Sequence, residues 1–424
     1  MYSVKTLALI IFIIMYVLMI ALPSKRVFTV AASAVLFVVF GVVPLREVPA
    51  GVNWNVLLML TGTMITVYYF IESGMPAYLA DVIMAKSKNI AAVTIYMSVF
   101  AGIVSAFIDN VATVLMIAPV ALAICMKLSV SPVPMLIAIS VSSNLQGAAT
   151  LVGDTTSILL GGYAKMDFLD FFFMNGRPGI FFAVELGALA TVFIMKYLFR
   201  KDKGAVETKT PEKVDDYIPT IMLVGIVIAL IVASFFKDKP EVTNGLICMA
   251  IALLTVAADY GQTRKMQNVV KALRTVDIET LLLLACLFVV IEGIENTGIL
   301  RDIAGLITGL GKNPFLVYSV IVWGSVLISA FVDNIPYVAT MLPVVTAVAG
   351  NLGLSPYLLY FGLLCGATLG GNLTPVGASA NIATLGILKK EGYNVSFKEF
   401  IRIGAPMTLT AVFVGYMFIW VFWR

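Results

Sequence analysis

Two short stretches place an aspartate beside an asparagine inside otherwise apolar sequence. SAFIDNVATVLMIAPV carries Asp109 and Asn110, and SAFVDNIPYVATMLPV carries Asp333 and Asn334. In a soluble protein, such a pair would be explained by helix capping alone, because Asp and Asn are good N-caps. At membrane depth a carboxylate is costly, and it usually serves ions, protons or a polar solute. We therefore predict that both pairs bind an ion or a solute while they also cap the helices that follow.

The composition predicts that these pairs lie in a membrane. The chain has 424 residues, of which 60% are hydrophobic and 12% charged, about half the charged share of an ordinary soluble domain. Charge-free windows long enough to cross the ~30 Å hydrocarbon core as helices recur along the chain. None shows the period-2 alternation of a membrane barrel. The predicted fold class is an all-α polytopic membrane protein, and because the chain has no histidine, a titrating group must be another residue type.

We predict about ten transmembrane helices and two re-entrant hairpins. The spans are expected at about 7–22, 26–44, 54–71, 132–162, 178–199, 217–236, 241–259, 276–293, 355–388 and 402–423, and the hairpins at 90–126 and 313–350. The arm that follows each Asp-Asn pair would be about 24 Å long as a helix, too short for the ~30 Å core. The hairpin tips are therefore expected at mid-membrane, lining a cavity instead of facing lipid.

The two Asp-Asn stretches belong to a repeat with an offset of 224 residues. Residues 105–120 and 329–344 are identical at eight positions, and further matches join 147–158 to 371–382. Each half has an odd number of spans, so the second half must be inverted in the membrane. The predicted organisation is a first repeat at 1–199 (hairpin 90–126, broken helix 132–162), a cytoplasmic linker at 200–216, and a second repeat at 217–424 (hairpin 313–350, broken helix 355–388). Inverted repeats with broken helices indicate a secondary transporter whose site lies near the midplane.

The distribution of basic residues predicts the orientation. With the N-terminus outside, 19 of the 28 lysines and arginines fall in loops on the inner side, as the positive-inside rule favours. Both termini would then face outward from a cell (inner) membrane.

Glycine and small hydroxyl residues fill the middle of two predicted spans. These stretches are NLQGAATLVGDTTS and TLGGNLTPVGASAN. Glycine permits unusual backbone angles, and Ser and Thr oxygens replace hydrogen bonds that an unwound helix loses. We predict that both helices break here, with Asp154, Thr155, Ser379 and Asn381 as candidate ligands.

The charge expected at the centre favours a cation over a dicarboxylate. Four helix N-termini would point inward, starting near Val111, Thr155, Ile335 and Ser379. Together they supply about +2 charges, against −3 from Asp109, Asp154 and Asp333 if all three are ionised. Such a site suits a cation, or a small neutral or proton-exchanged solute.

The motifs S-A-F-x-D-N, QGAATLVGD and GGNLTPVGASANI resemble those of the ion transporter superfamily. The most similar branch contains arsenite permeases, NhaD-type sodium–proton antiporters and the melanosomal pink-eye protein, with citrate and dicarboxylate–sodium symporters as cousins. The resemblance implies a homodimer that works as an elevator, with both hairpins and both broken helices in the moving part. It also implies two possible Na⁺ sites, one at Ser105, Asp109, Asn110 and Gly153, and one at Ser329, Asp333, Asn334 and Gly377.

The function expected first is secondary active transport coupled to H⁺ or Na⁺, with arsenite-permease-like export of a small oxyanion or its neutral acid. Na⁺/H⁺ antiport is the second candidate and di- or tricarboxylate symport the third; an ion channel is the alternative from another class. We expect no enzymatic activity, no cofactor beyond the coupling ion and no nucleic-acid partner; the expected partners are membrane lipid and a second copy. The chain has no GxxxxGK[ST] phosphate loop, so ATP hydrolysis would need a partner ATPase, which stays open.

Overall fold

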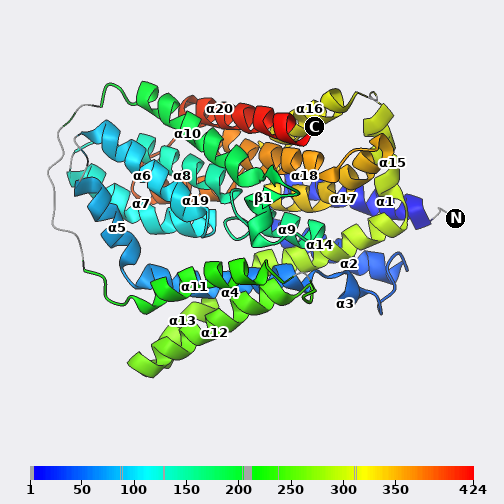
Figure 1. The fold of residues 1–424 in the computed structure, drawn as a ribbon, viewed down its shortest axis with the longest axis horizontal. Helices are drawn as coiled ribbons and strands as arrows, with labels where there is room; N and C mark the ends of the chain where they lie inside the picture. Colours follow the sequence, from blue (N-terminus) through cyan, green and yellow to red (C-terminus); the bar gives the residue numbers. More distant parts are fainter. Residues whose placement is uncertain are drawn as a thin grey trace.

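The computed structural model describes residues 4–424 except 86, 88, 128, 203, 205–212, 237, 310 and 312. It is a bundle of helices that run mostly along one axis (Figure 1). The helices of the first half are α1 (Val4–Ala21), α2 (Arg26–Val39), α3 (Val48–Gly51), α4 (Trp54–Glu72), α5 (Met75–Ala85), α6 (Ile90–Ser105), α7 (Asn110–Lys127), α8 (Val133–Gly147), α9 (Thr155–Ala164) and α10 (Ile180–Leu198). Those of the second half are α11 (Ile218–Ala233), α12 (Thr243–Thr263), α13 (Met266–Arg274), α14 (Ile278–Asn296), α15 (Ile299–Gly309), α16 (Pro314–Ser329), α17 (Asn334–Leu352), α18 (Pro356–Leu364), α19 (Ser379–Lys390) and α20 (Phe397–Trp423).

Six short elements complete the described chain. They are the single turns η1 (Pro23–Lys25), η2 (Phe168–Phe171), η3 (Cys365–Leu369, a π-helical turn) and η4 (Gly371–Leu373), and the strands β1 (Phe173–Met174) and β2 (Arg177–Pro178). The strands form an antiparallel hairpin closed by Asn175 and Gly176, which have φ of 53° and 73°. Asn-Gly is the usual sequence for such a two-residue turn, because both positions need positive φ.

The second half repeats the first in both helix order and helix boundaries. Asn53 accepts a hydrogen bond from Val56 N and caps α4, and Asp277, 224 positions later, accepts one from Thr280 N and caps α14. The turn after each of these helices is made by a glycine in the left-handed region, Gly74 at φ 74° and Gly298 at φ 75°. The same cap and the same glycine turn recur 224 residues apart, so α4 and α14 begin and end at matching positions. Local hydrogen bonding sets the cap, and local sterics set the turn.

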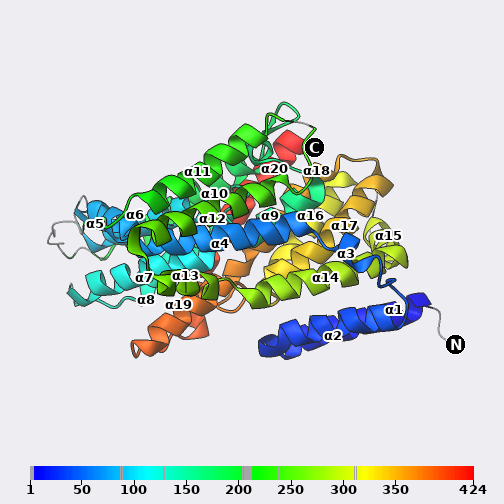
Figure 2. The ribbon, with the colours of Figure 1, turned by 90° about the horizontal axis from the view of Figure 1, so that it is seen from below.

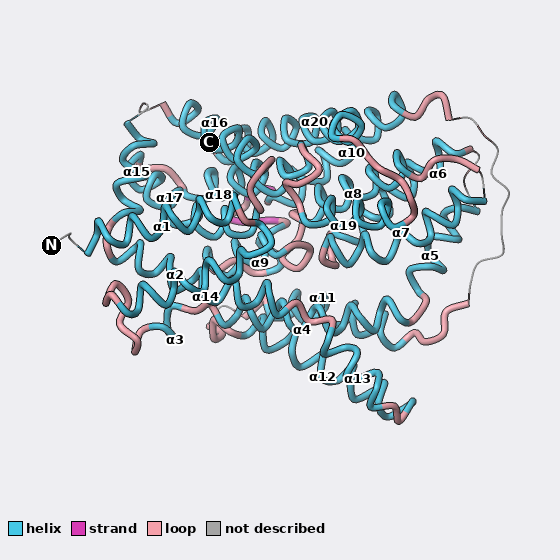
Figure 3. The backbone as a smooth tube through the Cα atoms, turned by 180° about the vertical axis from the view of Figure 1, so that it is seen from behind, coloured by secondary structure: helices cyan, strands magenta, loops and turns pink. Residues whose placement is uncertain are grey.

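The structure confirms the inverted repeats, the hairpins and the broken helices. Helices α6 and α7 form the first hairpin and α16 and α17 the second, and Figure 1 shows them reaching in from opposite ends of the molecule. The span predicted at 132–162 is interrupted between α8 and α9. The span predicted at 355–388 is interrupted by η3 and η4 between α18 and α19. Figure 3 shows loop segments that run through the middle of the molecule, where an unbroken bundle would have none.

Six helices among the described residues are long and apolar enough to cross a membrane, or seven spans if one bent pair counts as a single span. They are α1, α4, α10, α12, α17 and α20. Shorter apolar helices α2, α6, α7 and α11 accompany them. The short helices α5, α13 and α15 were not predicted, and the predicted linker at 200–216 lies partly outside the described residues.

Contacts divide the helices into two groups. Helices α1–α3 pack on α14, and α11–α13 pack with α4; these two sets meet where α14 contacts α4, and together we call them the flanking bundle. Helices α5–α10 and α15–α20 form the hairpin bundle, which contacts the flanking bundle mainly through α4 and α14. Figure 2 shows α1 and α2 side by side along one edge of the molecule, next to α14. Each bundle takes matching helices from both repeats, so the division cuts across the sequence halves.

Candidate functional site

A cavity of about 370 Å³ lies between the two bundles. From the hairpin bundle, the N-terminal ends of four helices reach it, through residues of α7, α9, α17 and α19. From the flanking bundle, the second half of α4, the start of α14 and Arg26 of α2 close the other side. The predicted convergence of helix N-termini is therefore present, and it creates a region with several polarised N–H groups and a positive local potential.

Three carboxylates line the cavity, and helix-start donors hold each of them. Asp109 Oδ2 accepts hydrogen bonds from Val111 N at 3.0 Å and Ala112 N at 3.1 Å. Asp154 Oδ2 accepts one from Thr156 Oγ1 at 2.8 Å, and Asp154 itself is 4% exposed. Asp109 therefore caps α7 and faces the cavity at the same time, so the two roles predicted for it are compatible.

The third carboxylate, Asp277, comes from the flanking bundle. It accepts hydrogen bonds from Thr280 N at 3.0 Å and Thr280 Oγ1 at 2.6 Å. Arg26 also lines the cavity and pairs with Asp333. These two charges were not in the estimate made from the sequence, and they cancel, so the expected slight negative balance is unchanged.

A buried amide network joins the two repeats behind the cavity. Asn110 Nδ2 donates to Asn144 Oδ1, and Asn144 Nδ2 donates to Asn372 Oδ1 at 2.8 Å. Asn381 Oδ1 accepts from Ser140 Oγ at 2.7 Å. Because buried amides need every partner, this chain fixes the side-chain orientation of Asn110 beside Asp109.

Backbone oxygens of each hairpin tip converge on a glycine of a broken helix. A Cβ on Gly153 would lie 2.6 Å from Gly147 O and 2.7 Å from both Ser105 O and Ala106 O. A Cβ on Gly377 would lie 2.5 Å from Gly371 O, 2.6 Å from Ser329 O and 2.8 Å from Ala330 O. Only glycine fits at these positions. In both repeats, Thr150 Oγ1 or Thr374 Oγ1 also donates to the carbonyl of Ala106 or Ala330.

The structure brings all twelve predicted ligand residues to one region, in two layers. The cavity wall holds Asp109, Asn110, Asp154, Thr155, Asn334 and Ser379. Behind it, in direct contact with the wall or with each other, lie Ser105, Gly153, Ser329, Asp333, Gly377 and Asn381. The assignment of these residues to ion or substrate binding stays a prediction.

Four contributors were missed by the sequence reasoning: Arg26, Asn144, Asp277 and Asn372. Asn144 and Asn372 lie inside the two glycine-rich stretches, and a polar amide at mid-span was a usable signal. For Asp277, the sequence indicated only that it could cap the helix that follows. Arg26 was expected at the loop edge of the span predicted at 26–44, and the structure does place it as the first residue of α2; its pairing with Asp333 was not expected.

The ligand set at the first hairpin fits a small, hard cation. Asp109 offers a carboxylate, and the carbonyl oxygens of Ser105 and Ala106 approach Gly153 nearby. Ser105 Oγ is buried without a hydrogen-bond partner among the described residues. Oxygen ligands of this kind suit alkali and alkaline-earth cations. Within the described residues, no group of three or more His, Cys, Asp or Glu side chains could hold a metal ion.

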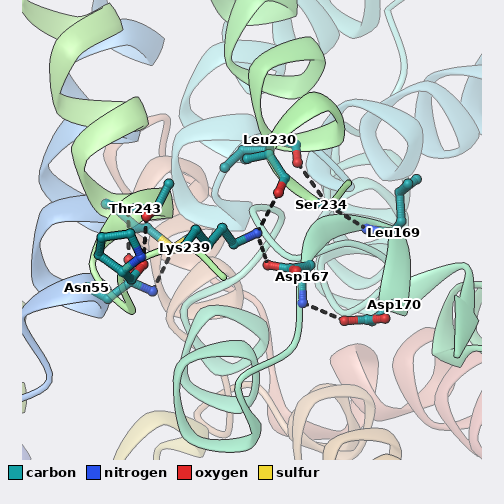
Figure 4. Close-up of polar contacts among 12 residues, drawn as sticks. Asn55, Asp167, Leu169, Asp170, Leu230, Ser234, Lys239 and Thr243 are labelled. Carbon is teal, nitrogen blue, oxygen red and sulfur yellow. Dashed lines mark hydrogen bonds and ion pairs between the residues drawn. The ribbon is translucent and has the colours of Figure 1, made fainter. Parts of the chain in front are cut away.

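Polar contacts between the bundles form two groups, one at Lys239 and Asp167 and one from α1 and α2 to α15 and the start of α17. Lys239, after α11, lies 2.5 Å from Asp167 Oδ1 and donates to Ala233 O at 2.8 Å. Nearby, Leu169 N donates to Ser234 Oγ at 3.4 Å (Figure 4). The bundles are thus fastened at these two groups of contacts, while the cavity separates them near Asp109 and the C-terminal half of α4.

Inverted repeats, re-entrant hairpins and a central cavity between two bundles define a multi-pass membrane transporter. Comparison with known families agrees, because the model of the citrate transporter family matches residues 7–363. The chain belongs to the citrate transporter family.

Two curated relatives align with most of this chain. An uncharacterized transporter of Mycobacterium tuberculosis is 32% identical over 394 residues, covering 88% of this chain and 87% of its own length. The human P protein is 27% identical over 465 residues, covering 91% of this chain and 56% of that protein, which confirms the resemblance to the pink-eye branch.

Two solved structures share the fold. The YdaH transporter of Alcanivorax borkumensis has a TM-score of 0.60 at 14% identity and covers 87% of this chain and 84% of its own. Neisseria gonorrhoeae MtrF, described as one of a class of antimetabolite efflux pumps, has a TM-score of 0.56 at 16% identity, with coverages of 88% and 83%.

Proposed function

We propose that this protein is a secondary active transporter in which H⁺ or Na⁺ binds at Asp109 and Asp154 of the cavity and at Asp333 of the second hairpin, and drives the movement of a small solute. The observation that carries the proposal is the convergence of Asp109, Asp154 and four helix N-termini on one cavity between the two bundles. Broken helices at a midplane cavity are the usual site of coupled ion and solute binding.

We further propose an elevator-type motion of the hairpin bundle against the flanking bundle. The hairpin bundle contains both hairpins and both broken helices, and it packs densely on itself but sparsely on its neighbour. Dense packing within a body and few contacts between bodies favour rigid-body displacement. A homodimer, both termini outside and an inner-membrane location stay predictions that accompany this proposal.

For the cargo, we propose a small oxyanion or its neutral acid, as in the arsenite-permease branch. The cavity wall carries three aspartates and one arginine, and that arginine is already paired with Asp333. A solute of low negative charge therefore meets less repulsion than a free di- or tricarboxylate. The family match favours a second candidate, a citrate-type carboxylate, which would have to enter together with protons or cations that balance its charge.

Transport by purified protein in proteoliposomes tests the proposal. With an imposed proton gradient recorded by a pH dye, Na⁺ or Li⁺ is added first, followed by arsenite, succinate and citrate in separate vesicles. Cation- or solute-dependent collapse of the gradient is expected in wild type and should be lost in Asp109→Asn. The matched control is Glu391→Gln, which removes an exposed carboxylate of the same bundle.

Each outcome has a distinct meaning. Collapse with Na⁺ alone would indicate Na⁺/H⁺ antiport and would replace the oxyanion as the main cargo. Collapse only with citrate or succinate would assign the carboxylate cargo. A flux that follows voltage without any coupling ion, or an unchanged flux in Asp109→Asn, would overturn the proposed mechanism.

A further inference from the structure

We infer that Arg26 is a tethered cation that neutralises Asp333 while the second hairpin rests against the flanking bundle, and that the coupling cation must displace it before the hairpin bundle can move. The inference deepens the proposed function and rests on it for its transport consequence. The pairing itself is a structural statement that can be tested without transport.

The contact places a fixed positive charge at the tip of the second hairpin. Arg26 Nη1 donates to Asp333 Oδ2, and the two side chains are 32% and 19% exposed. Asp333 Oδ1 meanwhile accepts from Ile335 N at 3.0 Å. Both carboxylate oxygens of Asp333 are therefore engaged, and partial burial strengthens the ion pair relative to one in water. A cation that binds Asp333 must compete with the guanidinium.

A second contact from the same helical pair holds the hairpin in this position. Tyr16 of α1 donates its hydroxyl to Pro336 O at 3.0 Å and also contacts Thr340 Oγ1. The residues at the matching positions of the first hairpin are Ala112 and Met116. Helices α1 and α2 of the flanking bundle thus contact the start of α17 at two points, through the Arg26–Asp333 ion pair and through the hydrogen bonds of Tyr16.

The first hairpin lacks a counterpart of the Arg26–Asp333 ion pair among the described residues. The counterpart of α2 is α12, which begins at Thr243 and has no basic residue in its first turn. Among the described residues, Asp109 has no ion pair with a basic side chain, and it faces the cavity. One hairpin carboxylate is therefore free for an external cation while the other is neutralised by the protein itself.

The arrangement links cation binding to motion through the cost of an unpaired charge. If the hairpin bundle moved away from α2 with Asp333 ionised and unpaired, a bare carboxylate would be left at membrane depth. A cation at Asp333 removes that penalty and releases Arg26. Arg26 therefore favours the position seen in the structure whenever no coupling cation occupies the second hairpin.

Distances between the bundles test the tether directly. Spin labels are attached at Arg46→Cys of the flanking bundle and Asn351→Cys of the hairpin bundle, both exposed, after Cys125, Cys248, Cys286 and Cys365 have been replaced by alanine. Pulsed dipolar spectroscopy is recorded on the full chain in nanodiscs with choline as the only added cation.

Arg26→Gln should raise the ratio of a second distance population to the first about tenfold, since a half-buried ion pair is worth more than an exposed one. Lys25→Gln, the exposed neighbour, and Arg26→Lys should resemble the parent protein. Equal distributions for Arg26→Gln and Lys25→Gln would overturn the inference.

Transport kinetics provide a second measurement, which should not change if Arg26 has only a structural role. With whichever cation drives flux in wild type, Arg26→Gln should lower the KM for that cation about tenfold, because the competitor is gone. Lys25→Gln should leave the KM unchanged, and an unchanged KM in Arg26→Gln would contradict displacement. If wild type shows no cation-driven flux, the proposed function fails, and the distance measurement still decides the role of Arg26.

Discussion

The tips of the two hairpins have nearly the same sequence and different surroundings. Both read S-A-F-x-D-N, both aspartates cap the helix that follows, and both tips rest on a glycine of a broken helix. At the first tip, Asp109 faces the cavity and Ser105 Oγ has no partner among the described residues. At the second, Asp333 pairs with Arg26 and Ser329 Oγ donates to Ala367 O at 2.6 Å.

The difference shows how a duplicated element acquires two roles. Local sequence sets the tip geometry, so the two tips are built alike. Their chemistry depends on the residues of the flanking bundle that each one meets, and the repeats differ there, because Arg26 of α2 has no basic counterpart in the first turn of α12. In this conformation the carboxylate and serine hydroxyl of the first tip remain available to a ligand, whereas those of the second tip are bonded to other residues of the protein. The following predictions would break or sharpen that contrast.

The glycine supports should matter equally at both tips. Gly153→Ala and Gly377→Ala each force a Cβ to within 2.5–2.8 Å of three backbone oxygens. We expect a loss of about 3 kcal/mol or more of stability in either variant, because a rigid backbone cannot yield as a side chain can. Thermal unfolding in detergent measures it, with Gly386→Ala, where a Cβ meets nothing within 4 Å, as the control. A large effect at one glycine alone would show that the tips are not equivalent supports.

The carboxylates should differ in cation binding even though both are needed for transport. Asp109→Asn should weaken cation binding to the purified protein about 100-fold, the loss of one charge-assisted contact. Asp333→Asn should change it by less than about threefold in this conformation, because Arg26 already occupies that carboxylate. Binding of radioactive Na⁺, with proton release recorded in parallel, provides the measurement. Equal losses in the two variants would mean that both tips bind the ion in the same state.

The two hairpin serines should differ in what they contribute: Ser329 should stabilise the fold, and Ser105 should contribute to cation affinity. Ser329→Ala removes a hydrogen bond to Ala367 O and should cost about 1 kcal/mol of stability without affecting cation affinity. Ser105→Ala removes a hydroxyl with no partner in the described chain, so stability should hold while cation affinity falls several-fold. Unfolding and binding measured on the same preparations separate the two effects. Reversal of the pattern would show that in this conformation the cation binds at the second tip instead of the first.

The smallest effect is expected from loosening the second hairpin alone. Tyr16→Phe removes the contacts to Pro336 O and Thr340 and should cost about 1 kcal/mol or less. Amide hydrogen exchange in 334–345 should then rise toward that of 110–121, while Tyr96→Phe, which removes an exposed hydroxyl, should change neither segment. Unchanged exchange would show that Tyr16 does not restrain the hairpin.

Several features could be predicted because their signals are local. The spans follow from hydropathy, and the first hairpin from the length of the arm after Asp109. At the second hairpin the length argument was wrong, because α17 has 19 residues and is long enough to cross a membrane, so there the repeat with the first hairpin was the valid signal. The breaks follow from glycine and hydroxyl residues within 144–157 and 368–381, and the inversion from an odd number of spans in each repeat. The short helices α5, α13 and α15 were missed because they lie between spans and have only 11, 9 and 11 residues, too few for a membrane span.

The sequence by itself determined the membrane fold, the two inverted repeats and the paired aspartates at the hairpin tips. Only the tertiary structure decided that the tips differ, that Arg26 meets Asp333 from 307 positions away, and that Asn144 meets Asn372 from 228 positions away. Hydropathy, caps and turns act over a few residues and repeat wherever their sequence repeats. Contacts between bundles depend on how two finished bodies dock, and no local pattern in either partner encodes that docking.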